Sequence, residues 1–260
     1  MSQYITTIQA ELVDGKINPL NHTPQQIADL VATGQVVIIK GGMNKQKLLD
    51  LRRELLAWSM RTPIVAQDDF KTNRHRYRVQ VAHTLKTPQV MHDFVFNDMH
   101  NAEEPIRSLM LSHFEPLRNF YISLTGNDIP WGPQEGPYFH PQVLHYPEGG
   151  GFFGSHIHNL LPQKIGVVVS MSQFGIDFEK GATVVEVNGE VADTEGFQDL
   201  GDILLFRYDL IHWVSQSNLH QRFSWETEKG RWTMILPLYD PFSGHVITWE
   251  DYDKANPKAI

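Results

Sequence analysis

The chain has 260 residues, is 41% hydrophobic, and carries a formal net charge of −8 with an isoelectric point near 5.9. An acidic chain repels the phosphate backbone, so we expect no nucleic acid partner. The absence of cysteine from the sequence excludes disulfides, zinc–thiolate sites and thiol nucleophiles, and it is typical of proteins of the reducing cytoplasm.

No targeting or membrane segment is visible in the sequence. Residues 1–10 lack the basic and apolar regions of a secretory signal, and no apolar stretch approaches the ~18 residues of a membrane span. We therefore expect a cytoplasmic protein without a membrane partner. The chain shows no repeat and no linker, so we predict one domain over residues 1–260, with helical support in about residues 1–130 and a core sandwich in about residues 131–250.

Helical patterns dominate the first half of the chain. Thr23-Pro24-Gln25-Gln26 has the residues of an N-cap, a first-turn proline and a capping-box glutamine. The apolar run Val36–Ile39 predicts a short buried strand, and the leucine spacing from Asn44 to Trp58 predicts an amphipathic helix. Residues 101–126 also have a helical pattern.

Three arginines alternate along residues 74–78, a spacing that would place them on one face of a strand. Such a stripe usually faces solvent. The functional alternative is contact with an anionic substrate, for which Arg76 and Arg78 are the candidate binding residues.

From about Tyr138 the chain changes to short β-type runs separated by glycine and proline, and their even spacing predicts a sandwich or barrel. The predicted strands are Tyr138–Tyr146, Ile165–Ser172, Ala182–Val187, Asp202–Phe206 and Arg231–Leu238. We therefore predict a mainly β fold with flanking helices, in which the strands form a double-stranded β-helix of the jelly-roll or cupin type.

Three histidines suggest a metal site. His156 and His158 are two residues apart, and side chains with this spacing point to the same face of a strand. His212 follows the apolar run Ile203–Phe206, which predicts a buried strand. Three imidazoles from two strands form a facial site that leaves cis positions open for O2 and substrate. With 13 histidines in the chain, the alternative is that His158 only hydrogen-bonds a neighbour and that the site has two protein ligands.

The segment from Gln142 to His158 resembles the first metal motif of the iron(II)/2-oxoglutarate-dependent oxygenases. The unit from Gly201 to Val214 resembles their distal-histidine strand, and Gly230–Leu238 resembles the strand that follows it. Residues Gly34–Lys40, followed by a helix, are similar to the phytanoyl-hydroxylase-like branch of the family. The resemblance covers most of the chain, with the motifs in the family's order.

This resemblance implies Fe(II), 2-oxoglutarate and O2 as metal, cosubstrate and oxidant, and a small molecule as substrate. It implies that Arg231 pairs with the far carboxylate of 2-oxoglutarate. Arg222 competes for that role by its spacing from His212, although it lies in a polar stretch that predicts a loop. Tyr146 is the residue of its strand that would face 2-oxoglutarate, and packing in the core is its alternative.

One position departs from the family's His-x-Asp or His-x-Glu pattern, because His158 stands where the carboxylate is expected. A site of three neutral imidazoles is less negative, which should raise the Lewis acidity and the reduction potential of the metal. The family's halogenases have a small residue here that frees a position for chloride, and the bulky His158 gives that chemistry no support.

Three other functions stay open at this point. The first is a cupin-like three-histidine dioxygenase that does not use 2-oxoglutarate. The second is a zinc-dependent hydrolase or isomerase, since three histidines and a water are also a zinc pattern. The third is a binding protein without catalysis. The sequence leaves the substrate, the reaction outcome and the oligomeric state open.

Overall fold

The computed structural model of the protein describes residues 2–63, 75–81, 87–96, 98–132, 136–160 and 163–239, and of residues 75–81 and 239 it describes the backbone alone. Within these ranges the protein is mostly β, with three α-helices and one large sheet. No helix in the described ranges is long and apolar enough to cross a bilayer.

The helices lie where the sequence predicts them: α1 is Pro24–Ala32, α2 is Lys45–Ser59 and α3 is Ile106–Thr125, preceded by a 3₁₀ turn at Met99–Asn101. The capping box of α1 is confirmed, because the side chains of Thr23 and Gln26 each accept the backbone N–H of the other. Helix α2 begins after Asn44, whose side chain accepts the backbone N–H of Lys47 at 3.0 Å.

Thirteen strands form the large sheet: β1 (Ile5–Val13), β2 (Lys16–Pro19), β3 (Val36–Lys40), β4 (His75–Val81), β5 (Gln89–Phe96), β7 (Gln142–Pro147), β8 (Phe152–His156), β9 (Ile165–Ser170), β10 (Thr183–Val187), β11 (Glu190–Asp193), β12 (Ile203–Arg207), β13 (His212–Val214) and β14 (Gly230–Ile235). Their order is β11-β10-β13-β8-β5-β7-β14-β9-β12-β3-β1-β2, and β4 pairs with β5. Strands β6 (Tyr138–Phe139) and β15 (Leu238–Tyr239) form a separate pair. The N-terminal half thus supplies strands as well as the expected helices.

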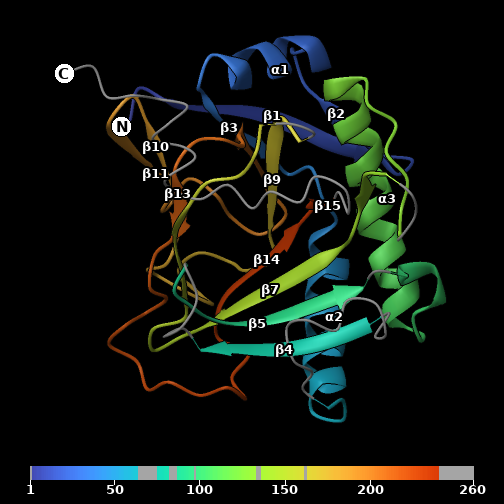
Figure 1. The fold of residues 1–260 in the computed structure, drawn as a ribbon, viewed down its shortest axis with the longest axis vertical. Coiled ribbons are helices and arrows are strands. Elements are labelled where there is room, and N and C mark those ends of the chain that lie inside the picture. Colours follow the sequence, from blue (N-terminus) through green and yellow to red (C-terminus); the bar gives the residue numbers. More distant parts are fainter. Residues whose placement is uncertain are drawn as a thin grey trace.

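Strand β5 joins the two halves of the sheet, because it pairs with β7 on one part of its length and with β8 on another. The sheet turns back on itself there, and side chains of β8, β10 and β13 line the same cavity as side chains of β7, β9 and β14. Figure 1 shows β10, β11 and β13 on one side of the molecule and helix α3 on the other. This is the jelly-roll arrangement predicted from the spacing of the short strands.

The alternation of side chains along each central strand separates two cores. On β12, Ile203 and Leu205 pack into the large core under the helices, whereas Leu204 and Phe206 pack into a smaller core between the two halves of the sheet. Because both faces of such a strand are buried, its sequence is a continuous apolar run.

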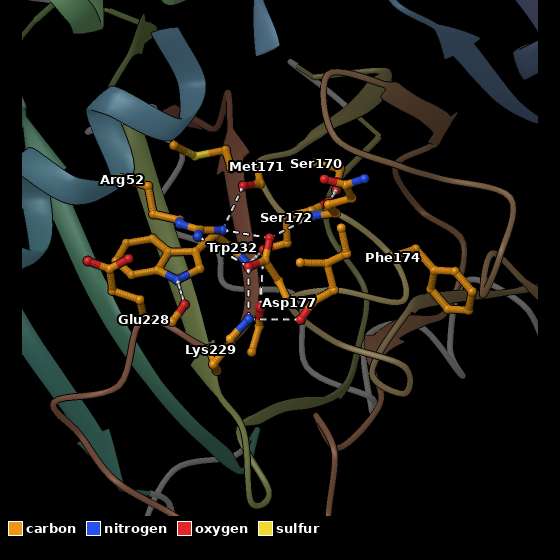
Figure 2. Close-up of polar contacts among 12 residues, drawn as sticks. Arg52, Ser170, Met171, Ser172, Phe174, Asp177, Glu228, Lys229 and Trp232 are labelled. Atoms are coloured by element: carbon orange, nitrogen blue, oxygen red, sulfur yellow. Dashed lines mark hydrogen bonds and ion pairs between the residues drawn. The ribbon is translucent and has the colours of Figure 1, made fainter. Parts of the chain in front are cut away.

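A buried ion pair connects helix α2 to the turn between β9 and β10 (Figure 2). The guanidinium of Arg52 donates to both carboxylate oxygens of Asp177, at 2.8 and 3.2 Å. The Asp177 carbonyl accepts the backbone N–H of Gly230 at 2.9 Å, and the ammonium of Lys229 lies 4.0 Å from the Asp177 carboxylate. These contacts fix the beginning of β14, which carries Arg231.

Candidate metal centre

The three predicted histidines meet beside β8 and β13. Each offers a ring nitrogen, and the three nitrogens lie within 4.8 Å of one another. His156 and His212 are direct partners in the antiparallel pairing of the two strands, with ring centroids 4.2 Å apart. Metal–nitrogen bonds of about 2.1 Å put ligand atoms roughly 3–4 Å apart, so closure around one ion needs a movement of about an ångström or less.

The turn that precedes the metal strand depends on glycine. Gly149 and Gly150 have φ values of 86° and 123°, in the region that favours glycine. A Cβ on Gly151 would lie 2.5 Å from the backbone nitrogen of Pro147. The three glycines therefore allow β7 to reverse tightly into β8 and deliver His156 opposite His212.

Two of the histidines are oriented by the same local hydrogen bond. The Nδ1–H of His156 donates to the carbonyl of Gly154 at 2.8 Å, and the Nδ1–H of His212 donates to the carbonyl of Leu210 at 2.8 Å. This donation selects the tautomer in which Nε2 carries the free lone pair. Both rings are therefore prepared to bind a metal through Nε2.

His158 is held differently. Strand β8 ends at His156, so the expectation that both histidines lie on one strand is wrong, and His158 lies in the segment after it. Its backbone N–H donates to the Tyr208 carbonyl at 3.3 Å, and its ring stacks on the Tyr208 ring with centroids 4.0 Å apart and planes at 13°. The side chain of His158 has no hydrogen bond to the described residues.

Burial keeps all three imidazoles neutral. It lowers the pKa of His156 to about 4. The pKa values of His158 and His212 lie well below the usual 6.5, through burial first and through the neighbouring imidazoles second. A neutral imidazole has the lone pair that metal coordination requires, so the donor set fits a divalent metal such as Fe(II) or Zn(II).

A cavity of about 460 Å³ lies next to the three histidines. Most of its lining is apolar and includes Met91, Leu144, Phe153, Phe206 and Ile235. Besides the three histidines, its polar lining consists of Thr87, Gln89, Asp93, His140, Gln142, Tyr146, Thr183, Tyr208 and Thr233. An organic molecule of moderate size fits this space, with one side of it against the histidines.

Arg231 is buried behind the wall of this cavity and does not line it. Its guanidinium donates to the Gly181 carbonyl at 3.1 Å, to the Thr183 hydroxyl at 2.6 Å and to the Gln198 side-chain carbonyl at 3.2 Å. Its Nε has no hydrogen-bond partner, and no ion pair within the described residues involves it. Burial lowers the pKa of Arg231 to about 10, so the side chain is still a cation at neutral pH.

Tyr146 lies beside Arg231, because the two residues are direct partners in the pairing of β7 with β14. Tyr146 is buried and lines the cavity, and burial raises its pKa above the usual range. Thr183 and Thr233 also line the cavity, and the Thr233 side chain lies near enough to the Tyr146 hydroxyl to act against the rise of its pKa. Neither threonine was predicted from the sequence, although Thr233 has a detectable signal: it stands two residues after Arg231, on the same face of its strand.

The other arginine candidates lie elsewhere. Arg222 is exposed in the loop between β13 and β14 and does not line the cavity. Arg76 and Arg78 belong to β4, where the backbone of Arg78 pairs with that of the cavity residue Asp93. The side chains of Arg76 and Arg78 lie outside the described part of the structure, so their predicted contact with substrate stays a prediction.

No family model and no curated protein matches this sequence. Solved structures do match its fold. A prolyl-4-hydroxylase from Pseudomonas putida has a TM-score of 0.52 at 10% identity, over 84% of this chain and 97% of that one. A putative oxygenase from Shewanella oneidensis has a TM-score of 0.56 at 11% identity, over 91% and 90% of the two chains.

A third match is SnoN, a non-heme, alpha-ketoglutarate-dependent epimerase from nogalamycin biosynthesis, with a TM-score of 0.51 at 12% identity over 84% of this chain and 82% of that one. At such identities the likeness concerns the fold. The three-histidine cluster lies in a jelly roll that matches these structures over most of both chains. The chain therefore has the jelly-roll fold of the iron(II)/2-oxoglutarate oxygenases.

Proposed function

We propose that the protein is a non-heme iron dioxygenase that uses 2-oxoglutarate and oxidises a small molecule, with His156, His158 and His212 as the metal ligands. The observation that carries the proposal is the convergence of three neutral imidazoles beside a cavity. Three protein ligands on one face would hold the metal and leave open positions for the cosubstrate and O2. The fold supports this assignment, because the matched structures include oxygenases.

Arg231 supports the use of an anionic cosubstrate. A buried cation without a contact ion pair is unfavourable, and a carboxylate that binds near it would add to the compensation that Asp193 gives from a distance. Its hydrogen-bond partner Thr183 stands two residues before Val185, which pairs with His212. Two residues span about 6–7 Å along a strand, a distance that an extended five-carbon dicarboxylate bridges.

When bound, iron and 2-oxoglutarate supply the oxidation chemistry with O2. The residues of the chain have three tasks. The histidines would hold the metal, and the apolar wall of the cavity would exclude water. Tyr146 and the neighbouring threonines would orient the far carboxylate, with the charge of Arg231 directly behind them. The substrate is a small organic molecule, with Arg76 and Arg78 as candidate contacts for an anionic group.

An anaerobic iron titration with and without 2-oxoglutarate tests the proposal. We expect one equivalent of Fe(II) to bind, and a visible metal-to-ligand charge-transfer band to develop only when 2-oxoglutarate is present. Iron binding without that band, together with O2 consumption without succinate, would favour the cupin-like dioxygenase. Binding of Zn(II) with a reaction that needs no oxygen would favour a hydrolase or isomerase. A protein that binds no metal would be a non-catalytic binding protein.

A further inference from the structure

The three candidate ligands are not held alike. His156 and His212 each have a ring N–H fixed by a backbone carbonyl at 2.8 Å. His158 has no such bond, and its closest ring contact is the stack on Tyr208, with centroids 4.0 Å apart. A ligand that is not oriented by a hydrogen bond needs another device to hold its ring in the coordination geometry.

Tyr208 is itself fixed at this position. Its backbone N–H donates to the Lys164 carbonyl at 3.1 Å, and its carbonyl accepts the backbone N–H of His158 at 3.3 Å. Gly166 lies against its ring and that of Phe206, since a Cβ there would come within 2.7 Å of both rings. The ring therefore lies in a fixed plane beside His158.

We infer that Tyr208 is the positioning residue of His158, and that its ring replaces the hydrogen bond that orients the other two ligands. Stacking fixes the plane of the imidazole and leaves its ring nitrogens without a hydrogen bond to the described residues, so that one of them can bind the metal. This explains how a histidine beyond the end of β8 takes the position in which a carboxylate would stand. The inference rests on the proposed metal site.

Titration with Co(II) alone, followed by its visible d–d bands, tests this role without any turnover. The contact between two aromatic rings corresponds to about a three- to tenfold change in an equilibrium constant. We expect Tyr208→Leu to weaken Co(II) binding by about this factor and to shift the bands toward those of His158→Ala. Tyr208→Phe keeps the ring and should bind Co(II) within about twofold of the unaltered protein.

A double-mutant cycle separates positioning from general damage. If Tyr208 acts through His158, then Tyr208→Leu has no further effect on Co(II) binding once His158 is alanine. An equal loss in both backgrounds, or a loss as large in Tyr208→Phe as in Tyr208→Leu, overturns the inference. Phe206→Leu is the matched control, because it removes a buried ring that lies 4.7 Å from the hydrogen-bonded His212, and it should weaken Co(II) binding less than Tyr208→Leu.

Gly166→Ala provides a second variant in case Tyr208→Leu does not fold. Its methyl group would press on the rings of both Tyr208 and Phe206 while leaving both residues in place, so Phe206→Leu is its control as well. We expect weaker Co(II) binding in this variant when His158 is present and no change when His158 is alanine, and an unchanged affinity in both backgrounds contradicts the inference. Failure of the unaltered protein to bind Co(II) would reject the metal site itself, which is a different result.

Discussion

His156 and His212 owe their orientation to their own local backbone. In each case the ring N–H reaches back to the carbonyl two residues earlier, so the tautomer is set before any metal arrives. We predict that His156→Ala or His212→Ala abolishes stoichiometric iron binding, because the two remaining imidazoles no longer enclose the ion. Metal analysis of anaerobically loaded protein checks this, and full occupancy in both variants would contradict the ligand assignment.

The charge of the third ligand sets a second prediction. His158→Asp restores an anionic oxygen donor, and we expect this variant to bind iron, because the other two ligands are unchanged. We expect its native reaction to be impaired, since the neighbours of His158 are the rings of Tyr208, His156 and His212, an arrangement built around a neutral third ligand. His158→Ala should bind iron weakly. Iron affinity and turnover, measured for both variants side by side, test whether His158 is a metal ligand. Values like those of the unaltered protein in both variants would mean that His158 does not bind the metal.

Arg231 and Arg222 form a matched pair for the cosubstrate. We predict that Arg231→Lys raises the 2-oxoglutarate concentration needed for half-saturation by more than tenfold. This corresponds to a loss of roughly 1.4 kcal/mol or more of binding free energy. A lysine has one ammonium group and cannot replace a guanidinium that donates to three acceptors. Arg222→Lys, at an exposed loop position, is the control. The charge-transfer band, followed as 2-oxoglutarate is added, measures the affinity of both variants for the cosubstrate. An effect seen only in Arg222→Lys would assign the binding of the far carboxylate to Arg222.

Individual residues were predictable where a short motif fixes them. The order of the motifs identified the three histidines, and the structure brings them together. The stack of His158 on Tyr208 was not predictable, because it depends on which side chain the turn after β12 places beside the end of β8. The role of Thr183 was not predictable for the same reason, since its hydrogen bond with Arg231 joins strands that are not neighbours in the sequence.

At the scale of the elements, helices were easier to predict than strands. Helices α1 and α2 carry capping residues in the sequence itself. Strand β1 was missed because its side chains are mostly half-buried or exposed, with Ile8 the buried one among them, so no apolar period marks it. Strand β8 was difficult because Gly154 and Ser155 interrupt its apolar residues.

The ion pair of Arg52 and Asp177 makes a prediction about elements. We expect Asp177→Ala to lower the free energy of unfolding by about 3 kcal/mol or more, because Arg52 is then a buried cation without its partner. The double variant with Arg52→Met and Asp177→Ala should be less destabilised than Asp177→Ala alone, since it also removes the unpaired buried cation. Urea unfolding measures all three proteins, and a double variant less stable than the single one would contradict this account.

At the scale of the whole molecule, buried histidines make the stability depend on pH. Burial lowers the pKa values of His92 and His113 to about 4, and that of His145 lies well below 6.5. The unfolded chain therefore binds more protons than the folded one between about pH 6.5 and pH 4. Their contribution to stability is complete above about pH 6.5 and is lost as the pH falls toward 4.

His113 offers a direct test of this dependence. It is fully buried in α3, and a shift of its pKa from 6.5 to about 4 corresponds to about 3 kcal/mol across that range. We predict that His113→Leu reduces the loss of unfolding free energy between pH 7 and pH 4.5. Urea unfolding at the two pH values measures the difference, and an unchanged slope would mean that His113 is already protonated in the folded protein or does not contribute.

The pairing of distant strands has a consequence for biosynthesis. His156 leaves the ribosome well before its partner His212, and neither β8 nor its neighbour β5 can complete the metal site alone. Strand β12 must find β3, near the other end of the chain, and β14 must find β7. Contacts of such long range form slowly and late. If the three histidines bind iron as proposed, the nascent chain cannot capture the metal during most of its translation, and metal loading follows synthesis of the last strands.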